Sequence, residues 1–209
     1  MFKKLSVIIP AYNEGRTIHL ILNKLKEVEL LNGIEKEIII INDFSKDDTE
    51  EAVKKYMNLN PEMNIQYFKH EVNKGKGAAL HTGIKKATGD YLIIQDADLE
   101  YDPQEFNLLL KPVLDGFADV VFGSRFIGGN AHRISFFWHT IGNKVLTFFS
   151  NMFSDLNLSD METCYKMFRI DIIQSLSLKE NRFGFEPEVT AKISRIPKIR
   201  IYEVGISYD

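Results

Sequence analysis

The sequence predicts an α/β protein with a single doubly wound, mainly parallel sheet and flanking helices. Short apolar runs alternate with amphipathic stretches through the first half of the chain, the order that produces such sheets. Polar or turn-forming residues directly follow four of these apolar runs. The chain has 209 residues, 44% of them hydrophobic and 26% charged, which suits one ordinary domain and is short for two. We therefore expect one domain over residues 1–209.

Five short apolar runs predict buried strands in the first part of the chain. They cover residues 5–9, 37–41, 64–68, 90–95 and 118–122, and the run at 64–68 is the weakest. The second half is less regular. Its strand candidates are residues 163–168 and 199–207.

Apolar residues at spacings of three and four predict helices between the strands. In chain order the helices hold Ile18, Ile21, Leu22, Leu25 and Val28, then Val53 and Met57, then Leu80, Ile84 and Ala87, then residues 103–114 and 135–153, with short helices near Ile172 and Glu188. Ser45 is the expected N-cap of the helix that contains Val53. Pro103 stands where a first-turn proline opens a helix.

In doubly wound sheets ligands bind beyond the carboxyl ends of the strands. That rule selects residues 10–14, 42–45, 96–100 and 123–125, all of which follow an apolar strand. Residues 126–135 contain Gly128, Gly129 and Asn130 and are expected to form a mobile loop.

The strongest chemical signal is the acidic stretch Asp96, Ala97, Asp98, directly after a buried strand. Two carboxylates one residue apart in an extended chain project the same way, so they can share one hard cation. Glu100 lies on the same side and is a candidate for a third ligand. The alternative is a solvated acidic turn that caps the next helix.

Two other strand ends carry residues suited to a nucleoside. Tyr12 can pack against a base, while Glu14 and Asp43 can accept hydrogen bonds from a base or a ribose. The alternative in both places is helix capping, with Asn13 as the cap in the first segment.

Residues 73–79 look like a phosphate loop but match neither of two phosphate-binding patterns. The dinucleotide pattern needs a third glycine where Leu80 stands, and the Walker pattern needs Ser or Thr where Gly77 follows Lys76. A basic helix start remains, which could bring Lys74 or Lys76 near a phosphate. A solvated helix N-terminus is the alternative.

Composition excludes several classes of protein. A net charge of -3 gives no overall attraction to nucleic acid. The single cysteine, Cys164, allows no internal disulfide and favours a reducing compartment, and a core role is favoured over a catalytic thiol. The sequence shows neither a signal-peptide pattern nor a run of eighteen apolar residues. We expect it to act in solution or from the cytoplasmic side of a membrane.

Five segments together resemble, in order and spacing, the inverting family 2 glycosyltransferases of the Rossmann-like GT-A fold. These segments are residues 7–14, 39–45, 73–79, 96–100 and 123–126. The resemblance covers essentially the whole chain, including residues 160–166 and 183–188. The subgroup it is most similar to is the dolichol-phosphate mannosyltransferase-like enzymes, which load a sugar onto a polyprenyl phosphate.

The resemblance implies a nucleotide diphosphate sugar, linked to UDP or GDP, as the donor. Its nucleoside would contact Pro10, Tyr12, Glu14, Ile41 and Asp43. The diphosphate and a Mg²⁺ or Mn²⁺ ion would meet Asp96, Ala97 and Asp98, with Asp98 as the principal metal ligand and Glu100 as a second.

The resemblance also implies roles for two residues later in the chain. Arg125 would bind phosphate or orient the acceptor, and Asp160 matches a family position discussed as a base or an acceptor-site residue. A phosphate acceptor is already ionised near neutral pH and needs no strong base, whereas a hydroxyl acceptor does. For Asp160 the alternative is a turn residue before a strand.

The acceptor and the membrane contact stay open at this stage. A glycan or other hydroxyl acceptor, or a non-catalytic nucleotide-sugar binding module, are the alternatives to a polyprenyl phosphate transferase. Residues 120–154 contain three basic residues, no acid and many aromatics, which is typical of an interfacial helix, although a core helix or a dimer contact also fits. Similar proteins continue into a basic segment and often into membrane helices, and we expect this catalytic domain to lack both.

Overall fold

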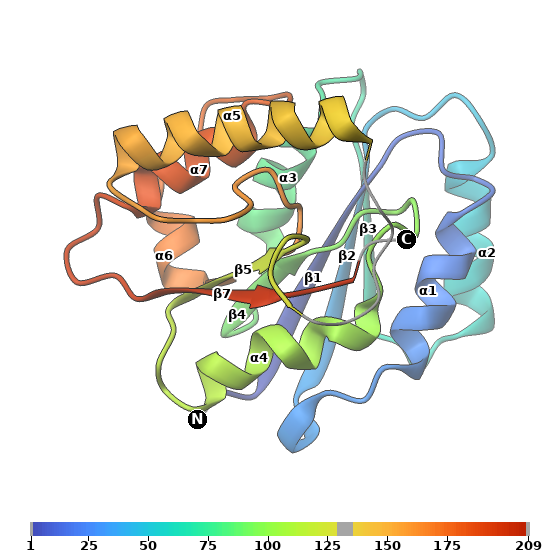
Figure 1. The fold of residues 1–209 in the computed structure, drawn as a ribbon. Helices are drawn as coiled ribbons and strands as arrows, with labels where there is room; N and C mark the ends of the chain where they lie inside the picture. Colours follow the sequence, from blue (N-terminus) through green and yellow to red (C-terminus); the bar gives the residue numbers. More distant parts are fainter. Residues whose placement is uncertain (1, 129–135, 208–209) are drawn as a thin grey trace.

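The computed structural model describes residues 2–128 and 136–207. Its centre is a seven-stranded sheet in the order β3-β2-β1-β4-β6-β5-β7 (Figure 1). The strands are β1 (Lys4–Ala11), β2 (Glu35–Asn42), β3 (Ile65–Lys69), β4 (Tyr91–Ile94), β5 (Val120–Ser124), β6 (Lys166–Arg169) and β7 (Ile201–Gly205). Each predicted strand is present, with its ends shifted by a few residues.

The sheet is mainly parallel, as the sequence predicted. β1 pairs in parallel with both β2 and β4, β3 pairs in parallel with β2, and β7 pairs in parallel with β5. The exception is β6, which lies antiparallel between β4 and β5. Because β2 and β3 extend to one side of β1 while β4 lies on the other, the chain order reverses between β1 and β4, and ligands of such sheets bind at that reversal.

Helices cover both faces of the sheet (Figure 1). One face carries α1 (Ile18–Glu27), α2 (Thr49–Leu59) and α4 (Phe106–Leu114), and the other carries α3 (Lys76–Lys86), α6 (Ile170–Ser175) and α7 (Phe185–Ile193). The long helix α5 (Phe137–Ser154) lies outside α7 and packs against it. Two short 3₁₀ turns complete the set, η1 (Leu31–Gly33) and η2 (Pro103–Glu105).

Alternating side chains of the central strands supply two hydrophobic cores. Val7 and Ile9 of β1 join the core under α1, α2 and α4, whereas Ile8 between them joins the core under α3, α6 and α7. All three are fully buried, and each such side chain stabilises the fold by about 1.5–3 kcal/mol. A strand buried on both faces reads as a continuous apolar run, which is why these strands were visible in the sequence.

Two predicted helix starts were wrong. Ser45 does not cap α2, which begins at Thr49, because the Ser45 hydroxyl accepts the Asn13 amide at 2.9 Å. Asn13 does not cap α1 either, since its backbone is left-handed (φ 60°) and that helix begins at Ile18. Pro103 opens the 3₁₀ turn η2, and the helix itself starts three residues later. Of the predicted loop 126–135, residues 129–135 lie outside the described residues.

Candidate functional site

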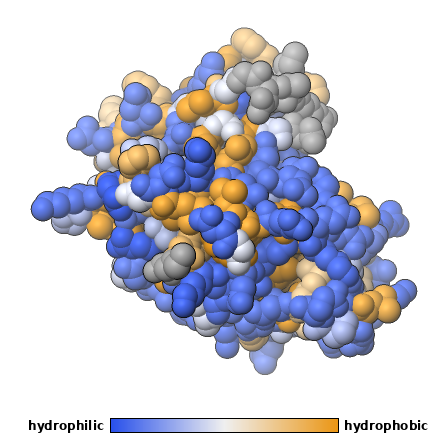
Figure 2. Space-filling view, turned by 90° about the horizontal axis from the view of Figure 1, so that it is seen from below, coloured by the Kyte–Doolittle hydropathy of each residue, from blue (hydrophilic) through white to orange (hydrophobic). Residues whose placement is uncertain are grey.

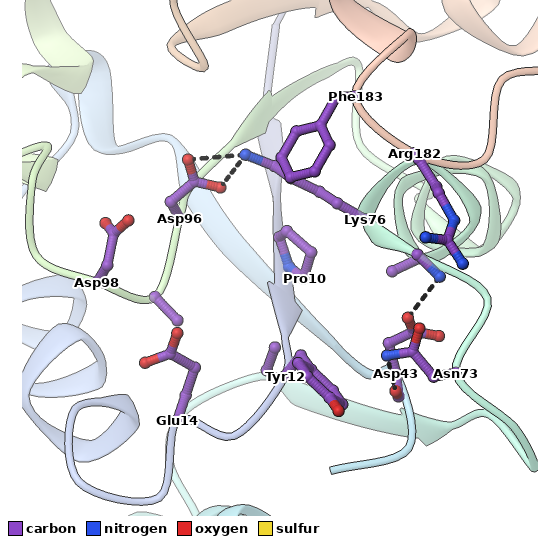
Figure 3. Close-up of a pocket in the computed structure, with 14 residues that line it drawn as sticks. Pro10, Tyr12, Glu14, Asp43, Asn73, Lys76, Asp96, Asp98, Arg182 and Phe183 are labelled. Carbon is purple, nitrogen blue, oxygen red and sulfur yellow. Dashed lines mark hydrogen bonds and ion pairs between the residues drawn. The ribbon is translucent and has the colours of Figure 1, made fainter.

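A cavity of about 380 Å³ opens at the carboxyl ends of β1, β2 and β4 (Figure 3). This is the point where the strand order reverses. Its lining consists of Pro10, Ala11, Tyr12, Glu14, Asp43, Asn73, Gly75, Lys76, Ala79, Asp96, Ala97, Asp98, Arg182 and Phe183. The fold therefore brings together residues from three separate strand ends, the start of α3 and the segment before α7.

Lys76 and Asp96 form an ion pair on one side of the cavity (Figure 3). The Lys76 ammonium lies 2.8 and 2.9 Å from the two Asp96 carboxylate oxygens, and 3.1 Å from the Cys164 sulfur. Burial disfavours the charged ammonium, but the Asp96 carboxylate outweighs it and holds the pKa of Lys76 well above its usual range. Lys76 therefore carries its charge into the cavity at physiological pH.

Asp98 lies beside Asp96 and also faces the cavity. Part of its side chain meets solvent, yet the partial enclosure of its carboxyl, and then the negative charge of Asp96, raise its pKa to about 6. The negative charges of two neighbouring carboxylates repel each other, and a bound divalent cation would relieve that repulsion. Such a pair is therefore a suitable set of ligands for the cation.

Glu100 does not join these two carboxylates at the cavity. Its backbone amide donates to Asp98 at 3.2 Å, across a left-handed Leu99 (φ 68°) that turns the chain, and its side chain is not part of the lining. Within the described parts of the chain, no cluster of three or more His, Cys, Asp or Glu side chains is arranged to hold a metal ion. The donor set that the structure offers is Asp96 with Asp98, and the predicted contribution of Glu100 is not seen.

Asp43 lines the opposite side of the cavity, but its carboxylate is already engaged. It accepts hydrogen bonds from His70 Nδ1 at 2.7 Å, from the Lys74 amide at 2.9 Å and from the Gly75 amide at 2.7 Å. These bonds fix the turn before α3. Asp43 therefore shapes the cavity wall, and of its roughly four acceptor sites about one remains for a ligand.

The other predicted nucleoside contacts differ in position. Tyr12 is 45% exposed and presents its ring at the mouth of the cavity, near Pro10 and Glu14 (Figure 3). The Glu14 carboxylate accepts the Thr17 hydroxyl. Ile41 is fully buried in the core against α3 and does not line the cavity, because alternate residues of β2 point to opposite faces of the sheet.

Outside this cavity, the partly buried Arg125 pairs with the fully buried Asp160. The Arg125 guanidinium donates from Nε at 2.7 Å and from Nη2 at 2.8 Å to the two oxygens of Asp160, and Asn143 donates to the same carboxylate at 3.1 Å. Asp160 is fully buried. Although burial raises the pKa of a carboxyl, the hydrogen bonds from Arg125 prevail and lower the pKa of Asp160. A carboxylate held in this way is a poor proton acceptor and a good anchor for Arg125.

Cys164 lies behind the Lys76–Asp96 pair. Burial, and then the charge of Asp96, raise the pKa of its thiol to about 12. Because the thiolate is the reactive form of cysteine, this environment disfavours a catalytic thiol and agrees with the structural role that composition favoured.

Arg182 and Phe183 also line the cavity. Arg182 lies outside every segment selected from the sequence, and Phe183 lies in the segment 183–188 of the resemblance, to which no role was assigned. They precede α7 and follow no strand, so the rule of strand ends misses them. A basic and an aromatic residue side by side in an irregular segment is the only signal, and it is weak.

Residues 6–177 match the family model described as Glycosyl transferase family 2. This match covers well over half of the chain.

The chain belongs to glycosyl transferase family 2.

Two curated relatives carry names that refer to dolichol or dolichyl phosphate. The UDP-N-acetylglucosamine--dolichyl-phosphate N-acetylglucosaminyltransferase of Methanococcus voltae is 30% identical over 98% of this chain and 85% of its own length. The dolichol-phosphate mannosyltransferase of Pyrococcus furiosus is 32% identical over 60% of this chain. The aligned part is 34% of that mannosyltransferase, so the chain spans about a third of its length. The predicted resemblance to this subgroup is confirmed.

Solved structures of glycosyltransferases share the fold. Glucosyl-3-phosphoglycerate synthase from Mycobacterium tuberculosis, crystallised with Mn²⁺, UDP and phosphoglyceric acid, superposes with a TM-score of 0.75 at 19% identity over 98% of this chain and 69% of its own. S. aureus TarS 1-349 with UDP-GlcNAc gives 0.64 at 22% identity, over 98% of this chain and 57% of its own. The predicted GT-A fold is confirmed.

Proposed function

We propose that this family 2 domain transfers a single sugar, with inversion, from a nucleotide diphosphate sugar to a polyprenyl phosphate, with Mg²⁺ or Mn²⁺ as cofactor. The observation that carries the proposal is the cavity at the strand-order reversal, which joins the Asp96–Asp98 pair and Lys76 to the exposed ring of Tyr12. The relatives named as dolichyl phosphate transferases support the acceptor class.

Asp98 and Asp96 would hold the divalent cation, which supplies positive charge against the charge that grows on the departing diphosphate. The Lys76 ammonium lies on the same side of the cavity as the Asp96 carboxylate. Its raised pKa keeps the ammonium charged, so it can hydrogen bond to a phosphate oxygen. Removing one such stabilising group commonly costs about 3–4 kcal/mol of transition-state stabilisation.

The state of Asp160 favours a phosphate acceptor over a hydroxyl. A hydroxyl nucleophile needs a base to take its proton, whereas Asp160 is fully buried and both of its oxygens accept from Arg125. A phosphate monoester brings its own negative charge and needs no such base. Asp160 then acts by holding Arg125.

Helix α5 supports a location at a membrane surface. Thr147 and Ser154 are its only buried residues in the part of the chain that the structure describes, so the predicted alternative of a core helix is wrong. The exposed apolar residues of its surface are Phe137, Trp138, Ile141, Val145, Leu146, Phe148, Phe149, Met152 and Phe153. No helix within residues 2–128 and 136–207 has both the length and the apolar character needed to cross a bilayer. We propose that α5 lies along the cytoplasmic face of a membrane that holds the acceptor.

A two-step experiment tests this function. Calorimetry with UDP- and GDP-linked sugars, with and without Mn²⁺, should show metal-dependent binding of one nucleotide class. A transfer assay should then yield a polyprenyl phosphate sugar from a short polyprenyl phosphate and none from a matched polyprenol. Transfer to the polyprenol, or to a glycan only, would favour the hydroxyl-acceptor alternative. Binding without transfer or hydrolysis would favour a non-catalytic binding module.

A further inference from the structure

The segment 180–183 forms one wall of the cavity, and two glycines at the start of α3 fix its position. The Ala78 amide donates to the Asn181 carbonyl at 3.1 Å. A Cβ at Gly75 would stand 2.5 Å from that carbonyl oxygen, and one at Gly77 would stand 2.8 Å from the Asn181 carbonyl carbon and collide with the Glu180 carbonyl oxygen. Only glycine at both positions permits this approach.

The same segment is held from its other side by α7. The Glu188 carboxylate accepts the backbone amides of Lys179 and Glu180, at 2.9 and 2.8 Å. The segment is therefore anchored between two helices rather than free to swing. Gly75 and Gly77, which lie in the predicted phosphate loop, thus form the surface on which segment 180–183 packs, called here its seat.

Arg182 is delivered by this segment into the cavity as an unengaged cation. Its guanidinium has no hydrogen-bond or ion-pair partner among the residues that the structure describes. In Figure 3 it points toward Asp43 and Asn73, with Asp96 and Asp98 across the cavity. Lys76, the other cation of the lining, is paired with Asp96.

Charge and position together separate the two ends of the cavity. The carboxylates of Asp96 and Asp98 mark the end for a metal-bound diphosphate, and the side of Tyr12, Asn73 and Asp43 is left for the nucleoside. Asp43 already accepts from three groups of its own chain, so we expect other groups to share the recognition at this end. Arg182 offers several donors there, and the base carbonyl and ribose oxygens are acceptors.

We propose that Arg182, positioned by the seat at Gly75 and Gly77, donates hydrogen bonds to the nucleoside part of the donor. This rests on the proposed function, because it assumes a nucleotide diphosphate in the cavity. Donor binding would then involve a residue just before α7 as well as the residues at the ends of the strands.

The first test replaces the side chain. Arg182→Gln should weaken the binding of the preferred nucleoside diphosphate in the presence of Mn²⁺ by about tenfold, the effect of one lost charge-assisted hydrogen bond, and should leave the binding of inorganic pyrophosphate with Mn²⁺ unchanged. Arg195→Gln is the matched control, because Arg195 is exposed and outside the cavity. Unchanged nucleotide affinity, or an equal loss with pyrophosphate, would overturn the proposal.

The second test displaces the segment that carries Arg182 by a substitution at Gly77, which does not line the cavity. Gly77→Ala must displace the carbonyls of residues 180–181 and should also weaken nucleotide binding several-fold, while Gly142→Ala, which meets nothing within 4 Å, should not. Circular dichroism confirms that each variant is folded. If Gly77→Ala is folded and binds like the unchanged chain, the seat has no role.

The two proposals fail in different ways. If the unchanged chain binds no nucleoside diphosphate, the proposed function itself fails. If it binds one and Arg182→Gln binds equally well, only the role of Arg182 is lost.

Discussion

At the scale of single residues, the two carboxylates of the cavity differ in how strongly they are already engaged by neighbouring groups. Asp96 is held by Lys76 at 2.8 Å, whereas Asp98 faces the cavity with a carboxyl whose pKa is raised to about 6. Under the proposed function, a cation that arrived with a diphosphate would find Asp98 less engaged than Asp96. Asp98 is the residue on which metal binding should depend most.

Replacing Asp98 with Asn tests this directly. The variant should lose most Mn²⁺-dependent nucleotide binding, and transfer should fall by roughly 10²–10³-fold, the usual cost of one transition-state stabiliser. Calorimetry and the transfer assay measure the two effects. Glu100→Gln is the control, since the Glu100 side chain lies outside the cavity lining. An equal loss in both variants would show that Glu100 is a ligand after all.

The Arg125–Asp160 pair gives a second prediction, on stability. Asp160→Asn removes the buried charge opposite Arg125 and should lower the free energy of unfolding by about 3 kcal/mol, the lower end for a broken buried pair. Urea denaturation measures the change. Asp155→Asn is the matched control, because Asp155 is exposed and Asn tolerates its left-handed backbone (φ 55°). Equal stability of the two variants would contradict the structural weight given to this pair.

At the scale of elements, the edge of the sheet is held by Asp119, just before β5. Its carboxylate accepts from Arg200 Nε at 2.9 Å, from the Arg200 amide at 3.1 Å and from Arg169 Nη1 at 2.6 Å. One carboxylate thus ties the residue before β7 and the last residue of β6 to the start of β5. The hydrogen bonds from Arg200 are the main reason that the pKa of Asp119 is lowered.

The lowered pKa of Asp119 determines how its contribution to the stability of the fold changes with pH. The stability that Asp119 contributes is fully present above the unfolded value of about 3.9 and is lost as the pH falls through the lower folded value. Asp119→Asn should therefore destabilise the fold at pH 7 by about 1 kcal/mol, a modest figure because both arginines are partly exposed. The difference should shrink as the pH falls and vanish below the lowered folded pKa. Thermal melts from pH 7 downward test this, with the exposed Asp115→Asn as control.

At the scale of the whole molecule, the exposed apolar side chains are unevenly distributed over the surface. The helix α5 runs along the top of the molecule in Figure 1, and its aromatic side chains reach 76% exposure at Trp138 and 77% at Phe153. The face seen from below, away from α5, mixes a majority of hydrophilic side chains with a central apolar group (Figure 2). This exposed aromatic helix surface is the observation that supports the proposal that α5 rests on a membrane.

Vesicle binding tests the role of α5. The unchanged chain should cosediment with vesicles that contain an anionic lipid, and the triple variant Phe137→Ser, Trp138→Ser and Phe148→Ser should bind at least about tenfold less, since each aromatic side chain contributes about 1–2 kcal/mol of apolar burial. Phe117→Ser is the control, because Phe117 is also exposed but lies beyond α4. A dimer that the same triple variant dissociates, with no vesicle binding by the unchanged chain, would assign α5 to self-association.

The sequence by itself determined the sheet and the place of the site. Strands such as β1 and β2 are buried on both faces, so their apolar runs were visible without any partner, and the residues after them had to meet at one edge. Pro10, Tyr12, Asp96 and Asp98 were found in that way.

Only the tertiary structure decided how those residues are used. It engaged Asp43 with a turn and Asp160 with Arg125, buried Ile41 in the core, left Glu100 outside the cavity and brought in Arg182 from a segment that follows no strand. The physical reason is that hydrogen bonds and close packing between residues distant in the chain depend on which surfaces meet. Local patterns of polarity carry no information about that meeting.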